Sequence, residues 1–184
     1  MRELILHILD IIENSREAGA DLIKLKIFEQ PEQDSLKIFL EDNGSGIDKD
    51  KIEDITDPFV TSRTTREVGL GLSLFKEAAE RCGGNFNIIS KKGKGTEVMV
   101  EFSYNHIDRA PLGDIITTLT SFIAVNGDSI DLMYRHKFKN REFCFDSREV
   151  KKELDGISIQ SGKIIGWIKN YLKDCFAEIY GGED

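Results

Sequence analysis

Four short segments rich in polar residues and glycine follow one another in the first half of the chain, and their order constrains its fold most. The first is HILDIIENSREAGA at residues 7–20, and the others are EDNGSGI (41–47), VGLGLSL (68–74) and GKGTE (93–97). Glycines at strand ends or before a helix let the backbone approach another group closely. Each segment alone is a weak signal, but their order predicts one nucleotide pocket assembled from four separated pieces.

The first half of the chain alternates predicted helices and strands. Apolar residues at helical spacing predict amphipathic helices at 2–18 and 70–82. Strands are predicted where apolar residues alternate or run together, at 21–28, 35–42, about 85–91 and about 96–103. We also expect a short helix at 49–55 and a loop at 57–68. This order of elements indicates an α/β (α+β) fold.

A domain boundary is predicted near residues 105–114, where Pro111 and Gly113 interrupt the pattern. It divides the chain into a domain at 1–104 and a small unit at 105–184. In the second unit we expect a helix at about 114–125, a hairpin at 130–136 and 142–146 that turns at Lys139–Asn140, and helices at about 148–154 and 162–178. This αββαα unit can lean on the first domain. Apolar spacing around Trp167 favours packing in a core or an interface.

Composition excludes several classes of function. A net charge of −8 and a pI near 5.0 oppose binding to nucleic acid, which requires clustered Lys and Arg. No apolar run approaches the roughly 20 residues that span a bilayer, and the N-terminus has the pattern of an amphipathic helix, so we expect a cytoplasmic protein. Cys82, Cys144 and Cys175 lack CxxC spacing, which argues against disulfides or zinc and favours reduced packing residues.

Asp10 and Asn14 stand one helical turn apart and therefore share the polar face of the first helix. An Asn oxygen can bind Mg²⁺ without adding charge, and a carboxylate one turn earlier can deprotonate a water or hydroxyl. The alternative is an ordinary solvated polar face. His7 lies on the same face, where we expect a surface residue or one that supports Asp10 from behind.

Asp42 is expected to point toward the core, because period two places it on one side of a strand with Leu36, Ile38 and Leu40. A buried carboxylate needs hydrogen-bond donors, and the exocyclic amine of a purine would supply one. By the same period Thr96 shares a face with Val98, Val100 and Phe102 and can enter the same cavity. Gly44 and Gly46 would let the chain pass close to the ligand. The alternative for Asp42 is a simple DNG turn.

The VGLGLSL segment places backbone N–H groups at the start of a helix, where phosphate oxygens bind favourably. Arg63 and Arg66, in the preceding loop, would either contact phosphates or be exposed charges of a lid. We expect residues 57–71 to form this lid.

Together the four segments resemble the GHKL superfamily, which contains DNA gyrase, the heat-shock chaperone of ninety kilodaltons, the sensor histidine kinases and the mismatch-repair ATPase MutL. The resemblance covers residues 3–103 and implies a two-layer α/β sandwich that binds ATP and Mg²⁺. It implies that Asn14 holds Mg²⁺ and that Asp42 binds the adenine amine. It places Gly46 in the same loop as Asp42, and it implies that Gly69, Gly71, Gly95 and Thr96 close on the phosphates and the base. We expect the nucleotide site also to include Gly44, Ile47, Arg63, Leu70 and Leu72.

The two halves of the motif set resemble different branches of that superfamily. ENSREAGADLIKLKIFE resembles the MutL form, whereas DPFVTSRTTREVGLGLSLFKEAAERCGG resembles the histidine-kinase form. The hydrolytic and serine-kinase branches carry a Glu as general base where this chain has Asp10, which is one methylene shorter. Histidine kinases tend to carry a Lys where this chain has Glu17. Because no sequence precedes the first helix, we expect the phosphoacceptor hairpin of a sensor kinase to be absent.

The resemblance predicts Mg-ATP binding, with slow hydrolysis or transfer of the γ-phosphate to a partner protein. The alternative is a nucleotide-dependent switch or adaptor with little turnover, and serine-kinase action as in anti-sigma factors lies between these two. The C-terminal unit resembles the tails of small stand-alone ATP-binding proteins found with anaerobic iron-hydrogenase systems. A protein partner is therefore expected, while the oligomeric state stays open.

Overall fold

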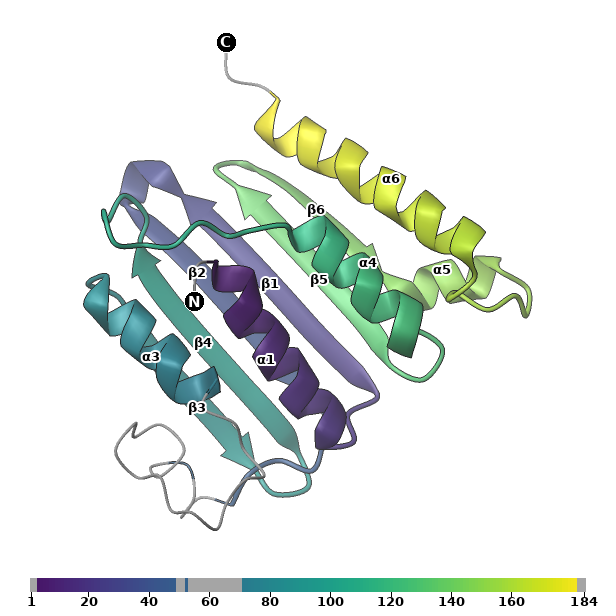
Figure 1. Cartoon of the computed structure of the whole chain (residues 1–184), viewed down its shortest axis with the longest axis horizontal. Coiled ribbons are helices and arrows are strands. Elements are labelled where there is room, and N and C mark those ends of the chain that lie inside the picture. The colour runs from purple at the N-terminus through teal and green to yellow at the C-terminus, as the bar shows by residue number, and fades with distance from the viewer. Residues whose placement is uncertain (1–2, 49–51, 53–70, 182–184) are drawn as a thin grey trace.

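The computed structural model describes residues 3–48, 52 and 71–181. Within these residues six strands form one mixed sheet in the order β3-β4-β2-β1-β5-β6 (Figure 1). The strands are β1 (Leu22–Gln30), β2 (Ser35–Asp42), β3 (Asn85–Lys91), β4 (Gly95–Ser103), β5 (Asp131–Phe138) and β6 (Arg141–Asp146). β1 and β5 are parallel, whereas the other neighbouring strands are antiparallel.

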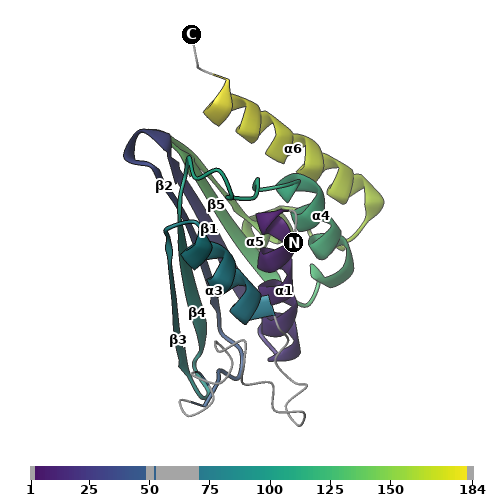
Figure 2. The same cartoon turned by 60° about the vertical axis from the view of Figure 1, so that its left-hand side comes forward.

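The helices form a second layer on one face of this sheet. They are α1 (Leu4–Glu17), α3 (Gly71–Arg81), α4 (Ile115–Asn126), α5 (Ser147–Glu153) and α6 (Gly162–Tyr180), and a 3₁₀ turn, η1 (Pro31–Gln33), joins β1 to β2. Figure 2 shows α1, α3, α4 and α6 on the same side of the strands. The predicted α/β sandwich is therefore confirmed. None of the helices in the described ranges is long and apolar enough to cross a membrane.

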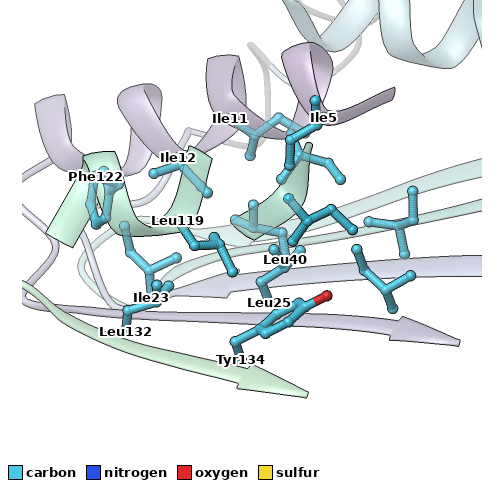
Figure 3. Packing of buried hydrophobic residues seen from close by; sticks show 14 of the residues in the cluster. Ile5, Ile11, Ile12, Ile23, Leu25, Leu40, Leu119, Phe122, Leu132 and Tyr134 are labelled. Carbon is cyan, nitrogen blue, oxygen red and sulfur yellow. The ribbon is translucent and has the colours of Figure 1, made fainter. Parts of the chain in front are cut away.

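Strict alternation of side chains explains why the helices cover only one face. In β1 the side chains of Ile23, Leu25 and Ile27 are buried, while Lys24 and Lys26 between them lie on the opposite face. The helices present matching apolar stripes, so side chains of α1 and α4 face those of β1, β2 and β5 across a common core (Figure 3).

Every predicted helix and strand that falls on described residues is present, with ends within two residues of the predicted ones. The hairpin turn at Lys139–Asn140 is confirmed as well, and Lys139 adopts a left-handed conformation there with φ of 53°. The short helix expected at 49–55 lies outside the described residues except for Ile52, and the loop expected at 57–68 lies wholly outside them.

Residues 105–181 extend the sheet of the first half, because β5 pairs with β1 along its length. The connecting segment also holds α1, since the carbonyl oxygens of Pro111 and Leu112 accept the N–H groups of Leu4 and Ile5 at 2.9 Å each. These bonds satisfy donors that a helix N-terminus leaves unpaired. The expected boundary at 104/105 therefore does not interrupt the sheet, and a division into two folding domains stays a prediction.

A buried polar network fastens α6 to the sheet. The Nε2 atom of His136 on β5 lies 2.8 Å from Oε1 of Glu29 on β1, and the Tyr180 hydroxyl of α6 donates to the same oxygen. Nδ1 of His136 lies 2.5 Å from the Tyr134 hydroxyl. Burial alone would raise the pKa of Glu29, but hydrogen bonds from His136 and Tyr180 outweigh it and lower that pKa. The network thus joins elements from both halves of the chain.

Two side chains are exposed where a packing role was expected. For Trp167 the core alternative is wrong, because 53% of its surface is exposed, whereas the interface alternative stays a prediction. Cys144 is exposed as well, whereas Cys82 and Cys175 are buried and unpaired as expected. Both exposed residues lie at the β6 edge of the molecule, Cys144 on the strand and Trp167 on α6, where no described element covers them.

Truncation of Leu119 tests the common core. Leu119 on α4 is fully buried in the cluster that also contains Ile12 and Leu25 of the first half. Leu119→Ala should lower the free energy of unfolding by about 2–5 kcal/mol because it leaves a cavity. Val125→Ala, on the same helix at a position that is 74% exposed, should change it by less than about 0.5 kcal/mol.

Denaturant unfolding followed by far-UV circular dichroism and by Trp167 fluorescence provides the measurement. One coincident transition, shifted by Leu119→Ala, is expected. Two separate transitions, of which only one responds to Leu119→Ala, would contradict a core shared by both halves.

Candidate functional site

Asp42 is buried at the end of β2, as the period of the strand predicts, and only 8% of its surface is exposed. Its Oδ2 accepts a hydrogen bond of 2.8 Å from the Ser15 hydroxyl of α1. Its Oδ1 accepts the backbone N–H of Gly44 at 2.8 Å. Both oxygens therefore have a donor within the protein, and a carboxylate keeps further lone pairs for a ligand.

Thr96 is the cross-strand partner of Asp42 in the β2–β4 ladder, so the two predicted residues lie side by side. The Thr96 hydroxyl lies 2.9 Å from that of Ser90 on β3. Ser90 also accepts the backbone N–H of Ile47 at 2.8 Å. The loop after β2 and the start of β4 are thereby joined at one end of the sheet, beside the C-terminal end of α1 (Figure 1).

Two glycines of the predicted motifs are required by contacts inside the protein. Gly46 has φ of 67°, and a Cβ there would lie 2.2 Å from the Lys91 carbonyl oxygen. Gly95 has φ of 96°, and its Cβ would lie 1.9 Å from the carbonyl oxygen of Asp42. L-residues with side chains rarely adopt this conformation, and backbone occupies the space. The structure thus shows close approach of two backbone segments at each of these glycines, and the expected close approach of a ligand stays a prediction.

Asp10 and Asn14 share a face of α1, and that face meets the start of α3. A Cβ on Gly71 would lie 2.9 Å from Cβ of Asp10 and 3.1 Å from its Oδ2. Partial desolvation raises the pKa of Asp10 above its ordinary value, although its side chain stays accessible to solvent. Asn14 is half-buried, and its amide forms no side-chain hydrogen bond with another described residue.

Of the remaining predicted residues, some lie in the described ranges and the others lie outside them. Leu72 belongs to the buried core, with 2% of its surface exposed, and Gly44 packs against Ala18 next to Asp42. Arg63, Gly69 and Leu70 lie outside the described residues, as does Arg66.

The expectation of a surface position for His7 is wrong, whereas a supporting role behind Asp10 stays a prediction. His7 is 3% exposed and stacks on Phe75 of α3, with ring centroids 5.0 Å apart and planes 3° from parallel. Burial lowers the pKa of His7 to about 4, and its Nδ1 atom has no hydrogen-bond partner in the described residues. The helix periodicity alone did not reveal that α3 covers this position.

Sequence reasoning missed three residues that hold the site together. Ser15 and Ser90 bond to Asp42 and Thr96, as described above. The Asn43 side chain accepts the backbone N–H groups of Asp21 at 3.1 Å and Leu22 at 3.0 Å, which ties the loop to the start of β1. A signal existed for Ser15, because it continues the buried stripe of Ile8 and Ile11 as a polar residue.

The donor set fits the adenine base and metal of Mg-ATP. Asp42 and Thr96 offer a carboxylate and a hydroxyl at the end of the sheet, and the Asn14 amide oxygen is available on the adjoining helix. Among the described residues no three His, Cys, Asp or Glu side chains group to hold a metal ion. One amide ligand is sufficient when phosphate oxygens and water complete the coordination of Mg²⁺.

Comparison with known proteins identifies the family. Residues 1–106 match the model of the histidine kinase-, DNA gyrase B-, and HSP90-like ATPases, which covers more than half of the chain. The chain belongs to this family. Membership supports ATP binding and, in general, phosphotransfer of the kinase type.

The chain is similar to several bacterial kinases over about half of its length. It is 33% identical over 96 residues to the autoinducer 2 sensor kinase/phosphatase LuxQ of Vibrio parahaemolyticus, which is 48% of this chain and 11% of that protein. It is 38% identical over 79 residues to the sensor kinase CckA of Brucella abortus, 42% of this chain and 8% of that protein. Sporulation kinase E of Bacillus subtilis is 31% identical over 97 residues, 52% of this chain and 13% of that protein. This chain therefore spans only a small part of each relative.

The buried His7 makes the stability of the protein depend on pH. The pKa of His7 in the folded protein is about 4, below the ordinary value of 6.5. Above pH 6.5 His7 is neutral in both states, and as the pH falls toward 4 the unfolded state binds a proton first, so the folded state loses stability. In the wild-type protein, His7 should lower the free energy of unfolding by about 2 kcal/mol when the pH falls from about 8 to about 5. In His7→Phe this part of the pH dependence should be absent.

Urea denaturation of both proteins at the two pH values measures this difference. Leu6→Phe, at an exposed position on the same helix, serves as the control, because it adds a phenyl ring without removing a titratable group. Equal pH dependence in the wild-type protein and His7→Phe would show that His7 is not held neutral by burial.

Proposed function

We propose that the protein binds Mg-ATP at the end of the sheet formed by β2 and β4, beneath α1 and the start of α3. It then hydrolyses ATP slowly or transfers the γ-phosphate to a partner protein. The observation that carries this proposal is the pairing of Asp42 with Thr96, with Asp42 held in place by Ser15 and the Gly44 N–H. A buried carboxylate fixed in this way is preorganised to accept a hydrogen bond from an adenine amine.

The roles of the other residues follow from their positions. Thr96 orients the base together with Asp42, and Ser90 keeps the Thr96 hydroxyl in place. Asn14 would hold Mg²⁺, which neutralises phosphate charge when it is bound. Gly71 lets α3 begin against Asp10, and the N-terminal turn of a helix favours the negative charge of phosphates.

Asp10 is the proposed general base. Its carboxylate projects from α1 beside Gly71, and partial desolvation raises its pKa, which increases its basicity. It would orient the attacking water or hydroxyl and accept its proton. Because Asp is shorter than Glu, we expect slow turnover.

A second candidate function is a nucleotide-dependent switch or adaptor with little turnover. Its support is the short side chain of Asp10, and Glu17 at the place where a Lys would contact phosphate. The kinase names of the three relatives favour phosphotransfer to a protein instead, and a serine kinase of the anti-sigma type would use the same base. We also propose that the C-terminal unit, residues 105–184, contacts the partner protein, and that this partner belongs to an anaerobic iron-hydrogenase system.

Asp42→Asn tests the nucleotide pocket. The change replaces an acceptor with an amide that can point its donor at the adenine amine, so the affinity for ATP should fall at least about tenfold. Glu41→Gln is the matched control, because Glu41 is the neighbouring residue on the opposite face and pairs with Lys24 at 2.8 Å. Isothermal titration of ATP in the presence of Mg²⁺ measures both. Undiminished affinity in Asp42→Asn would remove the pocket assignment.

Asp10→Asn separates catalysis from switching. If Asp10 is the base, release of phosphate or labelling of a protein in cell extract should fall by about a hundredfold or more, while ATP affinity is nearly retained. Glu13→Gln on the same helix should leave both unchanged. Radiolabelled ATP, scored as free phosphate against labelled protein, provides the readout. Turnover that is negligible in the wild type and unaltered in the variant would favour the switch.

A further inference from the structure

A groove of about 680 Å³ lies at the outer edge of the sheet, between β6, α5 and α6. Most of its lining is apolar and consists of Phe145, Val150, Leu154, Ile164, Trp167 and Tyr171. Trp167 and Tyr171 stack with ring centroids 5.5 Å apart, yet they remain 53% and 37% exposed. Large apolar side chains gathered in one open concave site are typical of a binding surface.

The groove runs beside a strand with a free edge. In the described part of the chain β6 pairs only with β5, so its outer edge offers backbone N–H and C=O groups for pairing. An extended segment that pairs with this edge would direct alternate side chains toward the helices. An added strand therefore fits the groove better than a helix, which could not use the backbone groups.

The charge of the groove indicates the chemistry of its occupant. Three carboxylates line it, Asp146, Glu149 and Glu153, whereas no Lys or Arg side chain does among the described residues. Asp146 pairs with Arg148 at 2.6 Å and Glu149 with Lys152 at 2.7 Å, while Glu153 makes no ion pair with a described residue. The chain carries a net charge of −8, so a second copy would bring like charge to this surface.

We propose that this groove binds an extended apolar segment flanked by Lys or Arg residues in a protein partner. The segment adds a strand to the free edge of β6, buries alternate apolar side chains against Trp167 and Leu154, and sets its cations beside Glu149 and Glu153. The groove lies at the β6 edge of the sheet, and none of its lining residues belongs to the proposed nucleotide site.

Trp167 reports directly on the groove because it is the only tryptophan in the chain. The first probe is a capped peptide of about ten residues, with a central stretch in which Val and Thr alternate and two Lys residues at each end. We expect it to shift Trp167 emission to the blue with saturation below about 1 mM. Two matched peptides should bind more weakly: one with Glu in place of Lys, and one with alternate backbone amides N-methylated, which blocks strand pairing.

Charge reversal supplies the second test. Glu149→Lys with Glu153→Lys should weaken binding of the Lys peptide about three- to tenfold, and Glu32→Lys with Glu80→Lys, at exposed positions away from the groove, should leave it unchanged. No response of Trp167 to the Lys peptide, or equal binding of all three peptides, would overturn the proposal. So would sedimentation that shows a dimer of the free protein with Trp167 shielded from quenchers, since a second copy would then occupy the groove.

Discussion

The arrangement of the site depends on a carboxylate that is buried where a strand ends. Burial of the polar oxygens of Asp42 costs free energy unless donors satisfy them, and two donors do so: the Ser15 hydroxyl of α1 and the Gly44 N–H of the following loop. These two bonds fix the distance between α1 and β2 and set the path of the chain after the strand. The same contact fixes the rotation of α1 about its axis, because a rotated helix would lose the Ser15–Asp42 hydrogen bond. The direction of the Asn14 side chain is fixed with it.

The loop contacts extend this constraint to the other strand of the site. Gly95 packs directly on the carbonyl of Asp42, and Ser90 links Ile47 to Thr96. Both glycine motifs therefore hold the loop after β2 against the turn between β3 and β4. For the proposed nucleotide site, backbone contacts of this kind would reduce the free energy spent on ordering its own groups when a ligand binds.

The C-terminal half contributes to the same site from a distance. Its connecting segment satisfies the first N–H groups of α1, β5 extends the sheet from β1, and the Glu29–His136–Tyr180 network holds α6 against that sheet. The start of α1, the helix that carries Asp10, is therefore held by Pro111 and Leu112, which follow the residues matched by the family model, 1–106. At the outer edge of this half, β6 has no further strand beside it in the described chain. Cys144 on β6 and Trp167 on α6 are exposed there.

The sequence by itself determined the periodic features: which segments are helices or strands, which face of each is apolar, and that Asp42 and Thr96 point toward the core. These follow from local geometry, since periods of 3.6 and 2 assign faces without knowledge of neighbours. The tertiary structure decided what covers each face. His7 is buried against Phe75, and Trp167 stays exposed. Ser15 bonds to Asp42, Ser90 bonds to Thr96, and β5 pairs with β1. Local periodicity could not predict these outcomes, because each depends on how separate segments of the chain pack together.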